Sequence, residues 1–450
     1  MKRKVVSLLL VLVMSLGLVA CGGSGSETKK ENEGSTEDVV NVTEDGFPAP
    51  VTEEGITITL WHSMNTGANG DSIADAVARF NESNEYGITV EAEYIGNYVE
   101  IYSKTVSAIA AGNNPVLAVL STAGLPNFAE KGVLADLSGY MERDGFDMNN
   151  VITQLTECTY YDDKVVSLPY TRSVNVLAYN KTMWNNAGVS LPTNMDELAK
   201  AGKTIHDKLG VYGYSTYLDV SYFQDALLVS LGSDGIMGTG TDVKCLEDGS
   251  METLLTDWVK GLDEGWIEKA KATNTEAMMK QSFFTGATAS MNVSSGGLTN
   301  MVETCKASGI DLCVAPMVGY NGYACSTGGG NWTVIQKNHS QQEIAAAWEF
   351  VKFMMSDEEV AATAVATGYL PTTYSSVETD TIKNLWQTSP EFKVAYDSLS
   401  NASTPVWSTY RMAWEKQVKA AMSYAVMDGS MTPEQVVEDL KQQKSLTFSE

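Results

Sequence analysis

The sequence is poor in the residues that most often build metal sites and disulfide frameworks. It has only three histidines and six cysteines in 450 residues. The histidines stand singly, at positions 62, 206 and 339, so no metal site is predicted. The cysteines, at positions 21, 158, 245, 305, 313 and 325, match no zinc or CxxC spacing. A chain this long can bury a sufficient core without disulfides, so we expect the last five to be mainly small core residues, with one bridge left open.

Sequence motifs of the common enzyme classes are also missing. No GxSxG elbow, P-loop, HExxH or EF-hand loop occurs, and the glycines at 328–330 are not followed by Lys-Ser or Lys-Thr. Acidic pairs such as Asp162-Asp163 could in principle serve a glycosidase. Because the chain has 56 acidic residues, such pairs arise by chance and more often mark a solvated face. We therefore predict no enzyme and no cofactor, and keep a secreted glycosidase as the less favoured alternative.

Basic residues are scarce, with 30 Lys and Arg against 56 Asp and Glu and a formal net charge of −26. Such a charge repels nucleic acids and anionic lipid headgroups, so a nucleic-acid-binding function is excluded. It does not exclude an anionic ligand, because salt screens surface charge over about 8 to 10 Å and a recessed site is governed by its own donors.

Long apolar runs are absent except at the N-terminus. Lys2, Arg3 and Lys4 precede an apolar stretch that ends at Cys21, which predicts a signal peptide over residues 1–20. The residues Leu18 to Cys21 resemble the lipobox that directs lipidation of a cysteine; a plain secretory signal is the alternative. Because no second run approaches the ~20 residues of a membrane helix, we expect the rest of the chain at the extracellular face of the membrane, held by the lipid.

Residues 21–54 comprise the lipidated cysteine and a polar segment with scarcely any large apolar side chain. This composition cannot bury enough surface to offset its ordering entropy, so it predicts a flexible tether.

From Ile56 onward the pattern is that of an α/β protein. Strands are predicted at 56–61, 88–94 and 116–120, with intervening helices, the first capped by Asp71 and carrying an apolar face at positions 73, 77 and 80. This alternation predicts a parallel sheet. Further helices are predicted at 192–209, 254–266, 342–355 and 411–426. About 400 ordered residues exceed a single core, so two lobes are expected.

Aromatic side chains next to small polar residues suggest a site for a polyol. Rings can cover the C–H faces of such a ligand while hydroxyls and amides bind its OH groups. For each single ring, core packing is the simpler interpretation. The candidates are Trp61, Tyr94, Tyr98, Tyr170, Tyr217, Tyr222, Trp332, Tyr369, Trp407, Tyr410 and Trp414.

Several of these stretches resemble the extracellular solute-binding proteins of ABC importers, in the carbohydrate group that includes maltodextrin-binding proteins. Within that group the chain is most similar to the sn-glycerol-3-phosphate-binding proteins, from about Ile56 to the C-terminus. The segments that carry the resemblance are Leu60-Trp61-His62-Ser63-Met64, Gly96-Asn97-Tyr98, Ala111-Gly112-Asn113, Pro169-Tyr170, Tyr179-Asn180-Lys181, Ser294-Ser295-Gly296, Gly328-Gly329, Thr367-Gly368-Tyr369-Leu370-Pro371 and Arg411.

The resemblance implies a two-lobed, periplasmic-binding-protein-like (Venus flytrap) α/β fold of the maltodextrin-binding-protein type. Lobe one would comprise residues 55–168 and 331–373, and lobe two residues 169–330 and 374–450. It further implies a monomer that captures a small molecule between the lobes and delivers it to two ABC permease subunits with a cytoplasmic ATPase. A phosphorylated polyol such as glycerol-3-phosphate, or a glycerophosphodiester, is the ligand that this likeness implies.

Carried over by position, the ligand-binding residues would be Tyr98, Thr122, Ser173, Ser294, Gly329, Tyr369 and Arg411. A guanidinium offers a forked cation to a phosphate, and hydroxyls and a backbone N–H can complete the shell. Without the likeness, Arg411 would be interpreted as part of a salt bridge. Thr122 stands where the glycerol-phosphate proteins carry a glutamate, so the hydroxyl end of the ligand differs. A neutral mono- or oligosaccharide is the alternative ligand.

Overall fold

The computed structural model describes residues 43, 45–65, 67–217, 221–269 and 275–448, without the side chains of residues 221, 222 and 275. The signal peptide predicted at 1–20 and the lipidation site predicted at Cys21 lie outside these residues. Among the described residues, no helix is long and apolar enough to cross a membrane.

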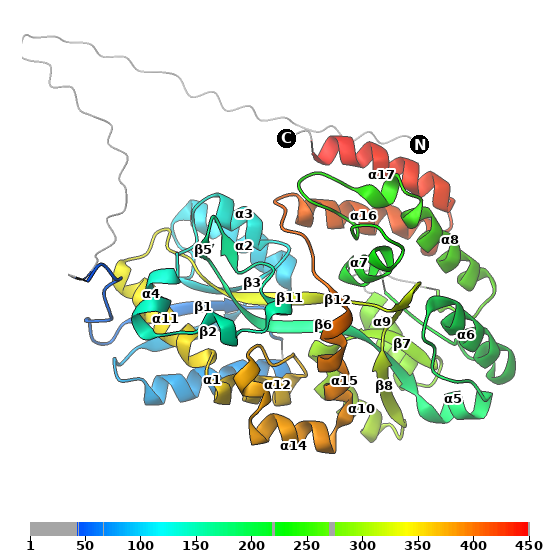
Figure 1. The fold of residues 1–450 in the computed structure, drawn as a ribbon, viewed down its shortest axis with the longest axis horizontal. Coiled ribbons are helices and arrows are strands. Elements are labelled where there is room, and N and C mark those ends of the chain that lie inside the picture. Colours follow the sequence, from blue (N-terminus) through cyan, green and yellow to red (C-terminus); the bar gives the residue numbers. More distant parts are fainter. Residues whose placement is uncertain (1–42, 44, 66, 218–220, 270–274, 449–450) are drawn as a thin grey trace, which may run out of the picture. The chain divides into compact units, whose positions relative to one another are not determined.

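One mixed sheet runs through the domain in the order β2-β1-β3-β11-β6-β7, with β12 beside β11 and β8 beside β6 (Figure 1). Strands β1, β2 and β3 are parallel, as their alternation with helices predicts. β11 and β6 pair antiparallel with each other; β11 also pairs antiparallel with β3, and β6 with β7. The strands are β1 (Thr57–His62), β2 (Thr89–Tyr94), β3 (Leu117–Ser121), β6 (Leu168–Asn180), β7 (Ser290–Ser294), β8 (Leu312–Pro316), β11 (Cys325–Val334) and β12 (Ala402–Ser403), with two short hairpins, β4 (Tyr160–Tyr161) with β5 (Lys164–Val165) and β9 (Val318–Gly319) with β10 (Gly322–Tyr323).

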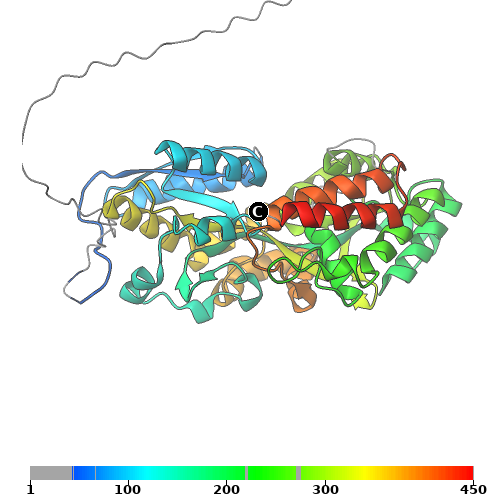
Figure 2. The ribbon, with the colours of Figure 1, turned by 90° about the horizontal axis from the view of Figure 1, so that it is seen from above.

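The long strands β6 and β11 divide the domain into the two expected lobes. We call the part with β1, β2, β3 and α11 lobe one, and the part with β7, β8, α8 and α16 lobe two; Figures 1 and 2 show them on either side of the β6 and β11 pair. Helices of lobe one include α1 (Ala68–Ser83), α2 (Tyr98–Ala111), α3 (Leu125–Glu130), α4 (Ser138–Asp144) and α11 (Gln341–Met354). Those of lobe two include α5 (Lys181–Ala187), α6 (Met195–Leu209), α7 (Ser221–Ser230), α8 (Ser250–Asp263), α9 (Thr275–Phe284), α10 (Leu298–Ala307), α16 (Arg411–Val426) and α17 (Pro433–Thr447).

Each lobe has its own buried core. In lobe one, the apolar stripe of α11 packs against the sheet, with Trp332 and Trp348 fully buried in one cluster. In lobe two, Trp258, Trp266 and Trp414 belong to a separate cluster. Between the lobes and along their lower side in Figure 1 lie α12 (Asp357–Thr367), α14 (Asp380–Thr388) and α15 (Pro390–Asp397). The short helix α13 (Tyr374–Val377) comes between α12 and α14 in the chain.

The predicted lobe boundaries remain predictions, but they coincide with features of the chain path. The 168/169 boundary falls at the start of β6, and 330/331 falls where the pairing of β11 with β6 shifts register. The 373/374 boundary falls at the N-cap of α13.

Several local predictions are wrong in detail. Asp71 does not cap α1, which begins at Ala68 after Gly67. The helix predicted from 192 begins only at Met195, where Asn194 accepts a hydrogen bond from Glu197 N. The helix predicted at 254–266 is shifted to Ser250–Asp263.

The tether prediction fails for its last residues. The side chain of Val51 is buried in the core of lobe one, and Thr52 N donates to Gln342 Oε1 at 2.7 Å. Arg143 donates to the Pro48 carbonyl at 3.1 Å. Residues 48–52 therefore pack onto lobe one.

The five cysteines after Cys21 are free thiols, so the bridge left open by the sequence is not formed among them. Four are buried, which confirms their prediction as small core residues. Among the described residues, no group of three or more His, Cys, Asp or Glu side chains could hold a metal ion.

Candidate ligand-binding site

A cavity of about 470 Å³ is lined by residues of both lobes and of the strands that join them. Its volume lies within the usual range of small-molecule sites. All seven positions that the family resemblance selected line this one cavity: Tyr98, Thr122, Ser173, Ser294, Gly329, Tyr369 and Arg411. That they contact a ligand stays a prediction.

Tyr98 is held by the N-terminus of α2. Asn97 caps this helix, and Asn97 and Glu100 form a reciprocal capping box, which sets where the first turn begins. The Tyr98 hydroxyl lies 2.7 Å from Thr171 Oγ1 on β6. Burial raises the pKa of Tyr98, so the phenol stays protonated and keeps a proton to donate.

Thr122 and Gly329 are joined by their backbones at the junction between β3 and β11. Thr122 N donates to the Gly329 carbonyl at 3.1 Å. Gly329 has φ +114°, and a Cβ there would collide with the Thr171 carbonyl on the neighbouring strand. Glycine is therefore required at 329 by the pairing of β11 with β6, independently of any ligand.

Two serines come from the strands of the central sheet. Ser173 lies in β6 and is 3% exposed. Ser294 is the last residue of β7, and its hydroxyl accepts a hydrogen bond from Gly296 N at 3.2 Å. Because a hydroxyl can accept and donate at once, Ser294 still has its proton for a group in the cavity.

Tyr369 follows α12 and leans over the turn after β7. Its backbone N–H donates to Thr367 Oγ1 at 3.0 Å. A Cβ at Gly296 would collide with the Tyr369 ring, so the absence of a side chain there lets the ring approach the turn.

Arg411 is the first residue of α16 and is 1% exposed. Its Nε donates to Glu415 Oε1 at 2.7 Å, and its Nη2 forms a very short ion pair with Asp225. Burial acts to lower the pKa of Arg411, but the charges of Asp225 and Glu415 outweigh burial and raise it. The guanidinium thus stays charged. The salt bridge expected for Arg411 is present, and Arg411 also lines the cavity, whereas its contact with a ligand stays a prediction.

The second cation at the cavity is paired in the same way. Lys280 and Glu276 line the wall and form an ion pair at 2.6 Å one helical turn apart on α9. Of the described lining residues, Lys280 and Arg411 are the cations and Glu276 and Glu415 the carboxylates. Charges on the wall are balanced, and the remaining polar groups are hydroxyls, amides and backbone N–H groups.

Sequence reasoning missed several lining residues. The i, i+4 spacing of Arg411 and Glu415, and of Glu276 and Lys280, was a readable signal for paired charges on one helix face. No local signal distinguished the rest. The missed polar residues are Asn65, Asn69, Ser121, Glu276, Lys280, Asn300, Thr327 and Glu415.

Of the eleven aromatic candidates, Tyr98, Tyr217 and Tyr369 line the cavity. Tyr170 and Trp332 instead stack in the core of lobe one, with ring centroids 4.0 Å apart. The other aromatic candidates are not among the described lining residues of this cavity, and the Tyr222 side chain lies outside the described residues.

The family model for bacterial extracellular solute-binding proteins matches residues 75–393. The chain belongs to this family. The match covers most of both lobes, including six of the seven candidate site positions; Arg411 lies beyond it.

Curated relatives agree with this assignment. This solute-binding protein is 25% identical over 346 residues to the sn-glycerol-3-phosphate-binding periplasmic protein UgpB of Rhizobium meliloti, covering 73% of this chain and 78% of the relative. It is 24% identical over 403 residues to UgpB of Pectobacterium atrosepticum, covering 85% and 88%.

Solved structures confirm the two-lobed fold. The GacH receptor of Streptomyces glaucescens, studied unliganded and with acarbose, superposes with a TM-score of 0.78 at 22% identity, covering 88% of this chain and all of that chain. UgpB from Mycobacterium tuberculosis in complex with glycerophosphocholine superposes with a TM-score of 0.77 at 20% identity, covering 87% and 98%.

Proposed function

We propose that this chain is the substrate-binding subunit of an ABC importer and captures a phosphorylated polyol, such as glycerol-3-phosphate or a glycerophosphodiester, between its lobes. One observation carries the proposal: seven positions chosen by likeness to glycerol-phosphate-binding proteins, and spread from 98 to 411, line a single cavity. The curated relatives bear that ligand in their names.

The donors around the cavity suit a phosphate. Arg411 keeps N–H groups beyond those that bind Asp225 and Glu415, because a guanidinium has five. Ser173, Ser294 and the Gly329 backbone add neutral donors. The Thr122 hydroxyl would face the hydroxyl end of the ligand.

A neutral mono- or oligosaccharide is the second candidate. The observation that favours it is the pairing of both wall cations with carboxylates, which leaves no uncompensated positive charge among the described lining residues. A dianionic phosphate bound at Arg411 would be repelled by the nearby Glu415 carboxylate. A sugar hydroxyl, in contrast, can accept a hydrogen bond from Arg411 and donate one to Glu415.

Transport would follow from lobe closure. Tyr98 and Thr122 belong to lobe one, whereas Ser294 and Arg411 belong to lobe two, so a ligand touching both sides stabilises the closed state. The closed monomer would then present a combined surface to two permease subunits driven by a cytoplasmic ATPase. A lipid on Cys21 would keep the protein at the extracellular face of the membrane.

Calorimetry on the mature chain carrying Cys21→Ser, which removes only the lipid site, tests the ligand. We expect saturable binding of glycerol-3-phosphate or glycerophosphocholine, abolished by Tyr98→Ala. Binding of maltose with no response to either phosphate compound would instead select the sugar. The proposal would be contradicted if none of these compounds bound and if the dimensions of the protein, measured by solution scattering, did not change in a broad mixture of ligands.

The lipid anchor has a separate test. The wild-type protein should be found in the membrane fraction and incorporate labelled palmitate, whereas Cys21→Ala should do neither. Release of the wild-type protein into the medium as a plain secreted chain would contradict the anchor without affecting the ligand proposal.

A further inference from the structure

A second cavity, of about 120 Å³, lies within lobe two and is separate from the cavity between the lobes. Among the described residues, none lines both cavities. The two come close along the chain, since Thr216 lines the inner cavity and Tyr217 the interlobe one. An engineered cavity of comparable size, about 150 Å³, accepts benzene.

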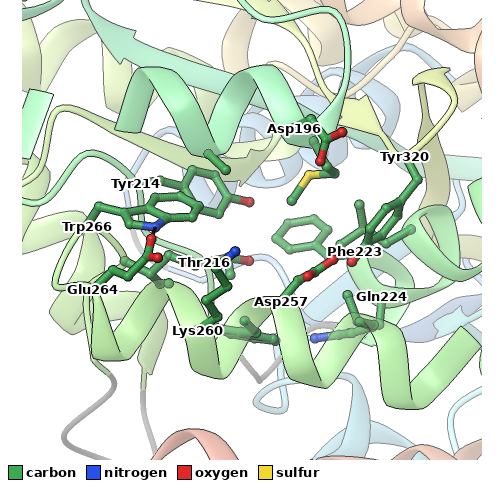
Figure 3. A pocket seen from close by; sticks show the side chains of 17 residues that line it. Asp196, Tyr214, Thr216, Phe223, Gln224, Asp257, Lys260, Glu264, Trp266 and Tyr320 are labelled. Carbon is green, nitrogen blue, oxygen red and sulfur yellow. Dashed lines mark hydrogen bonds between the residues drawn. The ribbon is translucent and has the colours of Figure 1, made fainter. Parts of the chain in front are cut away.

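Five of the 17 residues that line this second cavity are aromatic. Figure 3 shows Tyr214 and Trp266 on one side, Tyr320 on the other and Phe223 between them. Trp258 from α8 completes the aromatic lining. Four of these five side chains are buried, and Tyr320 is partly buried, so the rings form part of the inner wall of the cavity, together with aliphatic side chains such as Leu254 and Ile267.

Carboxylates surround the aromatic wall. Asp196 comes from the first turn of α6, Asp257 from α8 and Glu264 from the C-cap of α8, and all three are exposed. Lys260 is the one cation among the described lining residues, and none of these four charged groups forms an ion pair there within the described part of the chain. The rim therefore carries three negative charges against one positive charge, unlike the balanced interlobe cavity.

Aromatic faces and carboxylates attract the same kind of ligand. A ring has a negative face and a positive edge, so rings that turn their faces toward one space favour a cation there over a neutral group of equal size. Burial raises the pKa of the Tyr320 hydroxyl, and the negative charges of Asp257 and Asp196 raise this pKa further.

We propose that this aromatic cavity is a second binding site, for a small organic cation such as a quaternary ammonium group. Its methyl groups would contact the rings, and the carboxylates of Asp196, Asp257 and Glu264 would balance its charge from the rim. This site is independent of the ligand proposed for the interlobe cavity.

The test compares two probes of the same shape and different charge. Choline chloride and its neutral isostere 3,3-dimethylbutan-1-ol are titrated by calorimetry into the mature chain carrying Cys21→Ser, at constant ionic strength. We expect saturable choline binding, and binding of the isostere that is weaker by about tenfold or more. Equal binding of both probes, or no choline binding at millimolar concentration, would overturn the proposal.

Variants locate the site. Asp257→Asn, at the rim, should weaken choline binding about fivefold, and Asp196→Asn should act in the same direction. Asp263→Asn, an exposed carboxylate on the same helix as Asp257 but outside the described lining, is the matched control and should leave binding unchanged.

Two outcomes would overturn the proposal. If Ser294→Ala abolished choline binding and Asp257→Asn did not weaken it, the cation would be placed in the interlobe cavity. Glucose binding that depends on Asp257 would identify a sugar subsite instead and also overturn it.

Discussion

Arg411 and Glu415 face the interlobe cavity together, one helical turn apart on α16, with Arg411 Nε donating to Glu415 Oε1 at 2.7 Å. The carboxylate of Asp225 binds the other side of the same guanidinium. Two carboxylates, those of Asp225 and Glu415, therefore balance the charge of one arginine, which would otherwise give the wall a net positive charge. This arrangement makes the charge of the wall, and not the presence of arginine alone, the property that selects a ligand.

Glu415→Gln should shift the preference of the cavity toward anions. Glutamine keeps the size and a carbonyl acceptor for Arg411 Nε, but removes one negative charge from the wall. We expect the affinity for glycerol-3-phosphate to rise about fivefold, on the order of 1 kcal/mol, while the affinity for maltose changes by less than twofold. Calorimetry measures both. Glu438→Gln, in an exposed ion pair on α17, is the control, and an equal gain there would refute the local explanation.

Arg411→Met should destabilise the fold by about 3 to 5 kcal/mol, because it leaves the Asp225 carboxylate buried without its cation. Adding Asp225→Asn should restore most of that free energy of unfolding, since the buried charge is then gone. Ligand binding should stay lost in the double variant. Denaturant unfolding and calorimetry together measure these effects; a double variant as unstable as Arg411→Met would show that the carboxylate is not the cause.

Gly329→Ala should lower the stability of the folded protein even when no ligand is bound. A side chain at this φ of +114° collides with the Thr171 carbonyl, so we expect a loss of about 2 to 4 kcal/mol in the free energy of unfolding. Gly112→Ala is the comparison, because Gly112 also has positive φ but no atom within 4 Å of the added Cβ. Its loss should be about 1 kcal/mol. Equal losses would mean that backbone strain alone, and not the strand contact, is responsible.

The Asp144 carboxylate should make stability fall in acid. Burial acts to raise the pKa of Asp144, but hydrogen bonds from Arg143, Lys352 and Trp348 outweigh burial and lower it below its ordinary value. A lowered folded-state pKa contributes stability that is complete above the unfolded pKa of about 4 and is lost as the pH falls below it.

Asp144→Asn should therefore cost about 1 to 2 kcal/mol at pH 7 and progressively less below pH 4. Thermal unfolding of the wild type and the variant across pH 2 to 7 measures this. Asp263→Asn, exposed at the end of α8, should show no such trend. A constant difference between wild type and Asp144→Asn at all pH values would contradict the role of the charge.

The errors in the predicted elements have two causes: the apolar period of a helix does not include the polar residues that begin it, and docking depends on residues far away in the chain. Asn194, two residues after Pro192, caps α6, so the helix starts at Met195, later than its composition indicates. Asp248 accepts from Ser250 N at 2.9 Å and thereby starts α8 before its first periodic residue. Residues 48–52 looked like linker, yet Gln342, about 290 positions away, holds them in place.

The pattern of apolar and charged residues was sufficient to predict the α/β class and the parallel arrangement of β1, β2 and β3. It also predicted the apolar stripe of α11 and the bounds of α16, because these features depend on residues that are close together in the sequence. Family likeness selected the seven cavity positions. Only folding joined Arg411 to Asp225, 186 positions earlier in the chain, and enclosed an acidic, aromatic cavity in lobe two. Partners so far apart meet through packing of the whole lobe, and no local pattern records that packing.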